Sequence, residues 1–190
     1  MKILILNGSP RKNGKVSTLL HIAEKSLIEN GNSVTFIDVS SLNFKPCIGC
    51  MACRSKETCL LPEDDAHKIA QEIKSCDRII VGSPVYWGNM SGQLKCLFDR
   101  LVAVMMKESK SGIPCPLHKG KKAAIVTSCT TPFPFNILAG QTTKAESSIK
   151  EILKYSGFKI SKKIRLAGTK GMKEMPESTC KKIKNYCKKF

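Results

Sequence analysis

The sequence KILILNGSPRKNGKVSTLL at residues 2–20 contains a strand, a loop and the start of a helix. The apolar run at 3–6 has β-branched members and is typical of a strand buried on both faces. Turn formers and cations follow, and apolar residues then recur at helical spacing at Val16, Leu20, Ala23 and Leu27. Because a helix N-terminus offers unpaired backbone N–H groups and a positive dipole end, the loop before it is a candidate phosphate site.

Two better-known phosphate loops do not match this sequence. The P-loop pattern fails because five residues separate Gly8 from Gly14, and because Val16 cannot bind Mg²⁺ as a Ser or Thr hydroxyl does. The dinucleotide pattern G-x-G-x-x-G is absent as well. A loop lined by hydroxyls and an arginine suits the terminal phosphate of a mononucleotide, with an ordinary strand–helix connection as the alternative.

Length and charge set limits on what the chain can be. Its 190 residues, without a linker or repeat, predict a single domain over 1–190. The 32 Lys and Arg against 15 Asp and Glu give a formal charge of +17, which attracts anions at a distance. The cations are scattered and no zinc-finger or RNA-recognition signature is present. We therefore expect a solvated, lysine-rich surface and no nucleic-acid partner.

The short apolar runs and the number of cysteines indicate the cellular compartment of the protein. The run after Met1 and Lys2 is too short for a signal peptide, and no later run reaches the length of a membrane span. This predicts a cytoplasmic protein with no membrane partner. In a reducing compartment, ten cysteines indicate a metal centre or redox chemistry more often than structural disulfides.

Strands and helices are predicted to alternate along the whole chain. Strands are expected at 3–6, 33–39, 78–82, 121–127 and 159–166, the last polar enough for a sheet edge. Helices are expected from 16, from 63, over 94–105, over 141–156 and from 176. Loops fill 40–62 and 128–140, and 107–120 is expected to be irregular. The pattern predicts an α/β, flavodoxin-like three-layer fold with a five-stranded parallel sheet in the order 2-1-3-4-5. Its ligand would lie beyond the carboxyl ends of strands one and three.

Two motifs carry a family resemblance. GSPRKNG at 8–14 and GSPVYWGNMSGQLKCLFDR at 82–100 resemble the FMN reductase branch of the flavodoxin superfamily, and more narrowly the iron-sulfur flavoproteins. Both fall in the loops that the strand count assigns to the ligand. The resemblance implies an FMN-dependent oxidoreductase, reduced by NAD(P)H, in which flavin N5 carries the chemistry. No catalytic side chain is then required, and we expect His21, His67 and His118 to be structural or solvated.

The resemblance also implies which residues contact FMN. Ser9, Arg11 and Asn13 match the family's phosphate loop, with Ser17 as a nearby hydroxyl. Lys15 and Val16 stand where many members have Asn and Thr, so two side-chain contacts differ. The residues that match the loop around the flavin ring are Pro84, Val85, Tyr86, Trp87, Gly88 and Asn89, and Ser128 with the three residues after it would form the remaining wall.

A cysteine run lies after the second predicted strand. KPCIGCMACRSKETC at 45–59 places Cys47, Cys50, Cys53 and Cys59 in the pattern C-x2-C-x2-C-x5-C. Three cysteines at successive x2 spacings are similar to the ferredoxin run around a cubane cluster. A zinc site and a cluster-free loop at a subunit contact stay open as alternatives. The family resemblance implies a [4Fe-4S] cluster bound by all four thiolates. It also implies electron exchange with flavin across subunits, and hence a homodimer or homotetramer.

The other cysteines have no comparable spacing. We expect them to be buried small hydrophobes; they are Cys76, Cys96, Cys115, Cys129, Cys180 and Cys187.

Three functional hypotheses remain from the sequence. The first is an enzyme that passes electrons from NAD(P)H or a ferredoxin-like donor through FMN to a small-molecule acceptor such as oxygen, a quinone or another flavin. The second is a non-enzymatic carrier, in which a cluster and FMN relay electrons and NAD(P)H is not a substrate. A basic nucleic-acid-binding module is a third and weaker alternative.

Overall fold

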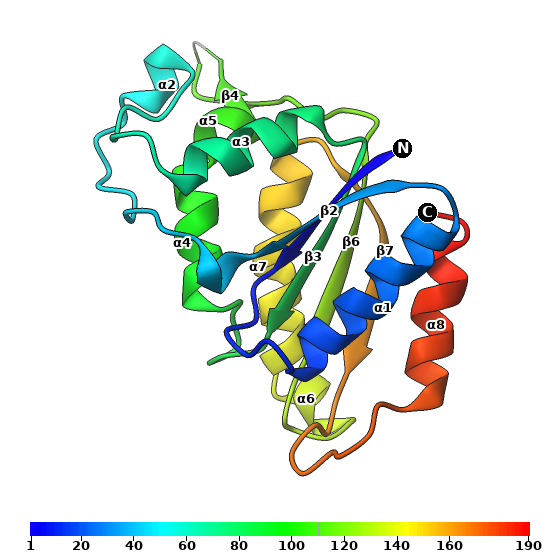
Figure 1. Ribbon diagram of the computed structural model, residues 1–190. Helices are drawn as coiled ribbons and strands as arrows, with labels where there is room; N and C mark the ends of the chain where they lie inside the picture. Colours follow the sequence, from blue (N-terminus) through cyan, green and yellow to red (C-terminus); the bar gives the residue numbers. More distant parts are fainter. Residues whose placement is uncertain (110) are drawn as a thin grey trace.

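The computed structural model describes residues 1–109 and 111–190, and its centre is one parallel sheet (Figure 1). Five strands lie in the order β2-β1-β3-β6-β7. They are β1 (Lys2–Asn7), β2 (Ser33–Asp38), β3 (Arg78–Pro84), β6 (Lys122–Ser128) and β7 (Lys159–Leu166). Since β6 and β7 are the fourth and fifth strands of this sheet, the predicted flavodoxin-like order 2-1-3-4-5 is confirmed.

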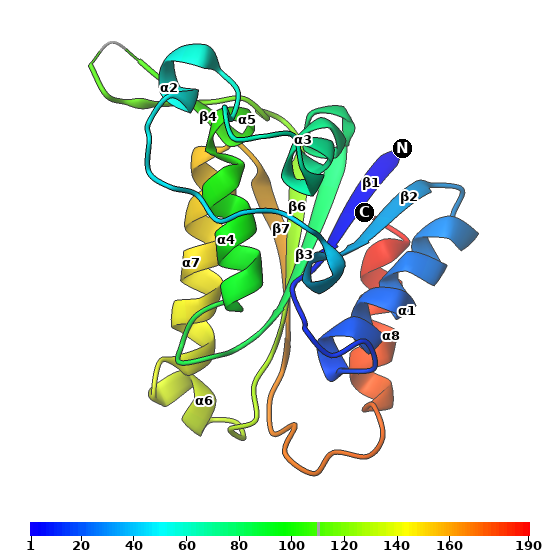
Figure 2. The ribbon, with the colours of Figure 1, turned by 60° about the vertical axis from the view of Figure 1, so that its left-hand side comes forward.

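Helices cover both faces of the sheet (Figure 2). On one side lie α1 (Lys15–Glu29) and α8 (Glu177–Cys187), and on the other α3 (Asp65–Ser75), α4 (Gly92–Arg100) and α7 (Gln141–Tyr155). Successive residues of β1 point to opposite faces, so Leu4 joins the core under α3, α4 and α7, whereas Ile5 joins the core under α1 and α8. The two-sided burial of this strand explains its continuous apolar run.

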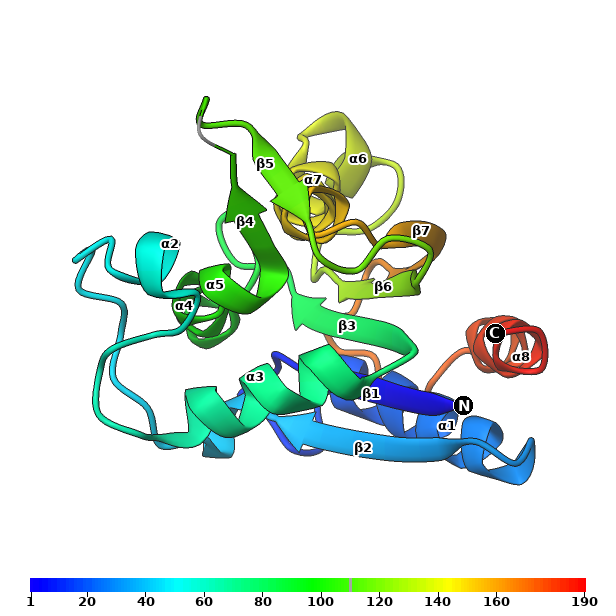
Figure 3. The same cartoon turned by 90° about the horizontal axis from the view of Figure 1, so that it is seen from above.

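Two predicted elements differ in the structure. The helix expected over 94–105 is divided into α4 and a short α5 (Val102–Met105), with the break at Leu101. The stretch expected to be irregular forms an antiparallel hairpin of β4 (Met106–Glu108) and β5 (Pro114–Pro116), seen from above in Figure 3; position 110 lies outside the described residues. The two prolines that indicated irregularity are tolerated because this two-stranded sheet consists only of edges.

Shorter elements occupy the predicted loops. A 3₁₀ helix, η1 (Val39–Ser41), and a single turn, α2 (Cys53–Lys56), lie in the segment between β2 and α3. Another short helix, α6 (Phe135–Leu138), lies between β6 and α7. Strand β7 is at the sheet edge, as predicted. No helix in the described part of the chain has the length and apolarity needed to cross a membrane.

The cysteines outside the 45–59 run are only partly as expected. Cys76, Cys129 and Cys187 are buried, which confirms the prediction for these three. Cys115 is exposed, and that prediction is wrong because the residue lies on the β4–β5 hairpin, which projects from the main sheet. The remaining pair, on α4 and α8, is intermediate in burial.

The two ends of the sheet carry different structures (Figures 1 and 2). The carboxyl ends of the strands lie beside the N-terminus of α1, the helix α6 and the loop between β7 and α8. The opposite end carries α2, α5 and the β4–β5 hairpin. Every predicted flavin loop is therefore at one end, and the turn that contains Cys53 is at the other.

Candidate functional site

Asn7 organises the loop after β1. This residue is fully buried, and its amide nitrogen donates hydrogen bonds to Asp38 Oδ1 (2.6 Å) and Ser17 Oγ (3.0 Å). Its amide oxygen accepts a hydrogen bond from the backbone N–H of Ser9 (3.1 Å). One side chain thus joins the ends of β1 and β2 to the first turn of α1 and to the loop between them.

The same loop is also braced by its own polar groups. The carbonyl oxygen of Arg11 accepts hydrogen bonds from Ser17 Oγ (2.7 Å) and from the backbone N–H of Gly14 (2.9 Å). Gly14 is the N-cap of α1, and no side chain caps this helix. The first N–H groups of the helix have no intrahelical partners and remain available to an anion.

The loop after β3 is fastened to the loop after β1. The backbone N–H of Gly8 donates to the carbonyl of Gly82 (2.8 Å), and Ser91 Oγ donates to the carbonyl of Gly8 (2.5 Å). Ser91 is the N-cap of α4, and its own N–H donates to Ser83 Oγ (2.9 Å). These contacts fix the two motif-bearing loops relative to each other.

A tight turn presents the aromatic residues of the second loop. Tyr86 and Asn89 exchange two backbone hydrogen bonds, each 2.9 Å long. The two residues between them, Trp87 and Gly88, have φ values of 51° and 71°, as in a type I′ turn. A tryptophan in the left-handed region is unusual, and this one is fully exposed. The turn therefore holds an indole ring in solvent at some cost in backbone energy.

These loops surround a cavity of about 600 Å³ at the carboxyl end of the sheet. Most predicted FMN contacts line it: Ser9, Arg11, Asn13, Lys15, Val16, Pro84, Val85, Tyr86 and Ser128. Trp87 and Gly88 line a neighbouring cavity of about 380 Å³, which shares Val85 and Thr130 with the first. Ser17 and Asn89 line neither cavity, because the first is buried behind the loop and the second closes the tight turn.

One wall of the larger cavity was not anticipated from the sequence. It comes from the loop after β7, and its residues are Thr169, Lys170, Gly171 and Met172. Hydroxyl Oγ1 of Thr169 donates to the carbonyl of Cys129 (3.1 Å), which fastens this loop to the end of β6. Lys15 Nζ also donates to the carbonyl of Lys173 (3.0 Å). This wall could have been expected from the topology alone, since the fifth parallel strand ends at the same edge of the sheet as the others.

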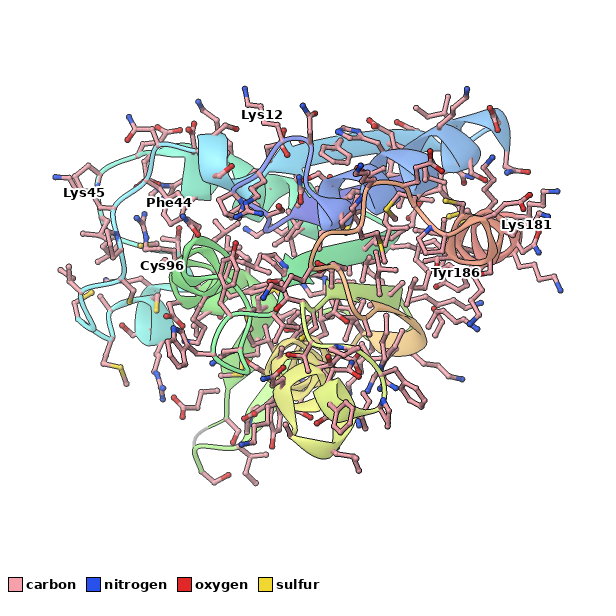
Figure 4. All side chains as sticks on the ribbon, turned by 90° about the horizontal axis from the view of Figure 1, so that it is seen from below. Lys12, Phe44, Lys45, Cys96, Lys181 and Tyr186 are labelled. Atoms are coloured by element: carbon pink, nitrogen blue, oxygen red, sulfur yellow. The ribbon has the colours of Figure 1, made fainter. Side chains whose placement is uncertain are left out.

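The cysteine segment, residues 45–64, runs from β2 to α3 along the side of α4. Figure 4, viewed from the carboxyl end, shows Phe44 and Lys45 on the same side as Cys96 of α4, and Lys181 of α8 on the other side. Phe44 packs against the core under α3, α4 and α7, which anchors the start of the segment. The side chains beyond it are mostly exposed.

The four cysteines of this segment are free thiols on one loop. Cys47 and Cys50 are exposed, whereas Cys53 and Cys59 are half-buried. Burial and the neighbouring thiols of Cys59, Cys47 and Cys50 raise the pKa of Cys53. Among the described residues, no three Cys, His, Asp or Glu side chains are gathered closely enough to hold a metal ion. The structure thus brings the thiols to one region without closing the loop around a common point.

The donor set fits an iron-sulfur cluster in type and number. Four thiolates complete the ligation of a [4Fe–4S] or [2Fe–2S] cluster. Gly49 has φ +69°, and a Cβ added there would meet no atom within 4 Å. The backbone between Cys47 and Cys50 therefore has open space beside it, in which the loop can fold around a bound group.

A buried arginine holds both ends of the segment. Arg100, the last residue of α4, donates from Nε to Cys59 Sγ (3.3 Å) and from Nη1 to the carbonyl of Lys45. Its Nη1 and Nη2 also bond Asp64 Oδ2 (2.8 Å) and Oδ1 (3.1 Å). Burial acts to raise the pKa of Asp64, but hydrogen bonds from Arg100 and from the Lys45 N–H outweigh it and lower that pKa.

The hairpin supports the middle of the segment from outside. Arg54 of α2 pairs with Glu108 of β4, and Lys107 Nζ lies 2.8 Å from Glu57 Oε1. Both pairs are partly exposed to solvent. The turn that contains Cys53 is therefore held against β4 by two ion pairs of opposite polarity.

The three histidines lie in different local environments. His67 completes a capping box with Asp64 at the start of α3, and its Nε2 lies 3.2 Å from the carbonyl oxygen of Cys59. His118 is buried and stacks on Phe158, and its Nε2 donates to the carbonyl of Val104 (2.8 Å). His21 is exposed on α1.

Known proteins resemble the chain in sequence. The iron-sulfur flavoproteins of Methanocaldococcus jannaschii and Methanosarcina thermophila are similar to the chain. The first is 40% identical over 100 residues, 53% of this chain and 51% of the relative; the second is 37% identical over 107 residues, 56% of each. The chain thus spans about half the length of the curated relatives it matches.

Solved structures agree in fold. The azoreductase AzrA superimposes with a TM-score of 0.78 at 14% identity, covering 100% of both chains. An NAD(P)H:quinone oxidoreductase from Methanothermobacter marburgensis gives 0.72 at 17% identity, covering 100% of this chain and 94% of that one. At these identities the likeness concerns the fold alone. Residues 1–132 match the profile of the NADPH-dependent FMN reductase family, and the chain belongs to that family.

Proposed function

We propose that the 190 residues form one FMN-binding domain that acts as an oxidoreductase. Electrons would pass from NAD(P)H, or from a ferredoxin-like donor, through FMN to a small-molecule acceptor. The observation that carries this proposal is the cavity of about 600 Å³ at the carboxyl ends of β1 and β3, lined by both family motifs. A cavity of this size at the switch point of a doubly wound sheet suits a mononucleotide.

The phosphate of FMN is proposed to lie at the N-terminus of α1. Arg11 and Lys15 supply positive charge there, and Ser9 and Asn13 supply polar side chains. The uncapped helix adds backbone N–H donors and the positive end of its dipole. Val16 contributes its N–H rather than the hydroxyl that many relatives have, so Lys15 is expected to compensate through charge.

The flavin ring is proposed to lie between the turn after β3 and the loops after β6 and β7. Pro84, Val85 and Tyr86 would cover one side, and Ser128 and Thr130 would contribute polar groups on another. The bound flavin supplies the hydride and electron chemistry, so the chain has to bind and orient it and limit its exposure to water. No side chain is assigned a proton transfer.

The second reactant is proposed to enter through the neighbouring cavity. That cavity of about 380 Å³ shares Val85 and Thr130 with the first, which places it beside the proposed ring site. Lys144 and Gln141 of α7 give it one cation and one amide, and Trp87 forms part of its rim.

We also propose that Cys47, Cys50, Cys53 and Cys59 bind a [4Fe–4S] cluster. Their spacing and thiol donor set support this assignment, and a reducing compartment such as the cytoplasm would keep all ten cysteines free. The turn with Cys53 and the flavin cavity are at opposite ends of the sheet in one chain. Direct exchange between cluster and flavin would therefore need a second copy, so we propose a homodimer or homotetramer.

One experiment tests the flavin and the cluster separately. Protein purified without oxygen is titrated with FMN and assayed for iron and acid-labile sulfide. We expect micromolar or tighter FMN binding and about four irons per chain, the content of a cubane cluster. Colourless protein that does not take up FMN would refute the flavin proposal. Flavin binding without iron would refute the cluster alone, and zinc in its place would favour a structural metal site.

The second candidate function is an electron carrier. The cysteine segment favours it, because a cluster and a flavin in one protein can relay single electrons without a nicotinamide substrate. Anaerobic mixing of the loaded protein with NADPH or NADH separates the two functions. Rapid bleaching of the flavin absorption band supports the reductase. An oxidised band that bleaches only with reduced ferredoxin supports the carrier.

A further inference from the structure

We propose that Arg100 is a positioning residue for the iron-sulfur cluster. It would close the cysteine segment on the protein and raise the reduction potential of the cluster through Cys59. The inference rests on the proposed cluster, and it concerns a residue outside the cysteine motif and 41 positions from Cys59. Nothing in the spacing of the cysteines indicates it.

The geometry places one cation between three parts of the segment. Arg100 Nε lies 3.3 Å from Cys59 Sγ, and its terminal nitrogens reach the carbonyl of Lys45 and both carboxylate oxygens of Asp64. Lys45 precedes the first cysteine of the run, and Asp64 follows the last. The two ends of the segment are thus joined through one guanidinium.

The guanidinium is almost completely out of solvent. Arg100 is 4% exposed, and its side chain within the ion pair is fully buried. A buried charge is expensive unless it is paired and fully hydrogen-bonded, and here Asp64 provides the paired carboxylate. An arginine is required for this arrangement, because its planar fork serves Asp64 while Nε remains free for Cys59. A lysine ammonium is a point donor without that fork.

The contact with Cys59 predicts an effect on electron transfer. An N–H donor and a positive charge beside a ligating sulfur stabilise the cluster more strongly after it has gained an electron, because its negative charge is then larger. Hydrogen bonds to the sulfurs and net charge are among the factors that set the potential of such clusters. Arg100 is therefore expected to make the cluster easier to reduce.

A role in holding the loop alone would give a different result. In that case Arg100→Gln and Asp64→Asn would have the same effect, since each breaks the same ion pair and asparagine can still cap α3. If the donor at Cys59 matters as well, the two residues differ. Loss of Asp64 would loosen the segment but would not lower the potential, whereas loss of Arg100 would do both.

The experiment compares Arg100→Gln, Arg100→Lys and Asp64→Asn with the wild type, all reconstituted with iron and sulfide without oxygen. Lys95→Gln is the matched control, because it removes an exposed positive charge from the same helix, where the ammonium of Lys95 is paired with Asp99. The readouts are iron release to a chelator and the midpoint potential of one-electron reduction. FMN affinity and thermal unfolding report on folding, since the flavin cavity is at the other end of the sheet.

We expect Arg100→Gln to release iron about tenfold faster or more, as for other residues that orient metal ligands, and to have a more negative potential. Arg100→Lys should show a smaller negative shift in midpoint potential than Arg100→Gln, because it retains the positive charge, but it should also release iron quickly. Asp64→Asn should release iron quickly without a negative shift in potential, and Lys95→Gln should match the wild type. If Arg100→Gln does not fold, Arg100→Lys against Asp64→Asn provides the same comparison.

Three outcomes would overturn the inference. Wild-type release rates and potentials in both Arg100 variants would leave the arginine without a role. Equal negative shifts in the Arg100 and Asp64 variants would reduce it to loop anchoring. Wild-type protein that binds FMN but takes up no iron and sulfide would remove the cluster proposal as well, so the two failures are distinguishable.

Discussion

The loops around the proposed flavin cavity, here called the flavin end, are joined to one another by buried side chains. The cysteine segment is instead held by residues of other elements, namely Arg100 of α4 and the β4–β5 hairpin. Around the cavity proposed to bind FMN, buried Asn7 and Ser91 join loops that come from neighbouring strands of one sheet. The cysteine segment has few buried side chains of its own and depends on Arg100 and on the hairpin. We infer that the flavin site is preformed, and that the cysteine segment completes its structure when a group binds.

The difference has a physical origin. The loops at the carboxyl edge leave strands that are fixed by the sheet, so a short loop has few conformations open to it. The cysteine segment spans twenty residues, 45–64, between β2 and α3. Ordering a chain of that length costs conformational entropy that its exposed side chains do not offset.

Substitution of Gly82 should damage the flavin end most. A Cβ at this position would lie 2.5 Å from Leu20 Cδ1 and 2.9 Å from Val16 Cγ1, where α1 packs on β3. We expect Gly82→Ala to lower the free energy of unfolding by about 3 kcal/mol, the upper end of the usual cost of overpacking. Chemical denaturation measures the loss, and FMN titration measures the accompanying weaker binding.

The matched control is Gly92→Ala, since a Cβ at Gly92 would meet nothing within 4 Å at the start of α4. It should be neutral or slightly stabilising, because alanine is the better helix former. Equal stability of the Gly82 and Gly92 variants would mean that the strand–helix contact is looser than we describe.

Asn7→Ala should weaken the flavin site next most strongly. The variant removes three hydrogen bonds and leaves the partners at Asp38, Ser17 and Ser9 without their amide. Unsatisfied buried groups cost about 1–3 kcal/mol, and we expect about 2 kcal/mol here together with weaker FMN binding. Asn32→Ala, on the connection between α1 and β2, is the control. An Asn7 variant with wild-type FMN affinity would show that the loop does not need this bracing.

Trp87→Asn should separate stability from function. Asparagine tolerates the left-handed backbone that tryptophan adopts here with φ 51°, so the fold should gain up to about 1 kcal/mol. The exposed ring would be lost from the rim of the second cavity, and turnover with the second reactant should fall several-fold. Thermal unfolding and steady-state kinetics give the two readings. Unchanged turnover would mean that the indole serves another purpose.

The sequence predicted the fold and the position of both motif loops at one end of the sheet, because each motif directly follows a strand. The order of the strands followed from the alternation of elements, and most motif residues, such as Arg11 and Tyr86, line the cavity. The loop after β7 escaped prediction because Thr169 and its neighbours form no motif. Ser17 was assigned to the phosphate on the basis of its hydroxyl, but in the structure that hydroxyl donates to the carbonyl of Arg11.

The cysteine end was harder to predict because its supports are remote in sequence. The spacing of the cysteines identifies candidate ligands, but it carries no information on Arg100, which is 55 residues from Lys45. The hairpin was hidden by Pro114 and Pro116, which normally interrupt strands. Cys115 is exposed because it lies on that hairpin, so its exposure could not be predicted without the hairpin. Contacts of this kind depend on tertiary packing and not on a local pattern.

Acidification should destabilise the framework beneath the cysteine segment. Burial lowers the pKa of His118 below its ordinary value of 6.5, and the hydrogen bond to Val104 only partly opposes this. As the pH falls below 6.5, the unfolded chain takes up a proton before the folded one, so stability decreases until the folded pKa is passed. His118→Gln keeps an amide donor but no titrating group. Its free energy of unfolding should vary less between pH 7 and pH 5, and an equal slope would refute the assignment.

Glu108→Ala should produce the smallest effect, confined to the cysteine segment. Its ion pair with Arg54 is partly exposed, so global stability should change by less than about 1 kcal/mol. Release of α2 from β4 should nonetheless loosen the backbone around Arg54 and Lys56, whose side chains are already exposed, and trypsin should cleave there a few times faster. Glu177→Ala, which breaks an exposed pair with Lys181 on α8, is the control and should leave that cleavage unchanged. If both variants are cleaved at the wild-type rate, the Arg54–Glu108 pair does not restrain the segment, and the attachment from outside reduces to Arg100 and the pair between Lys107 and Glu57.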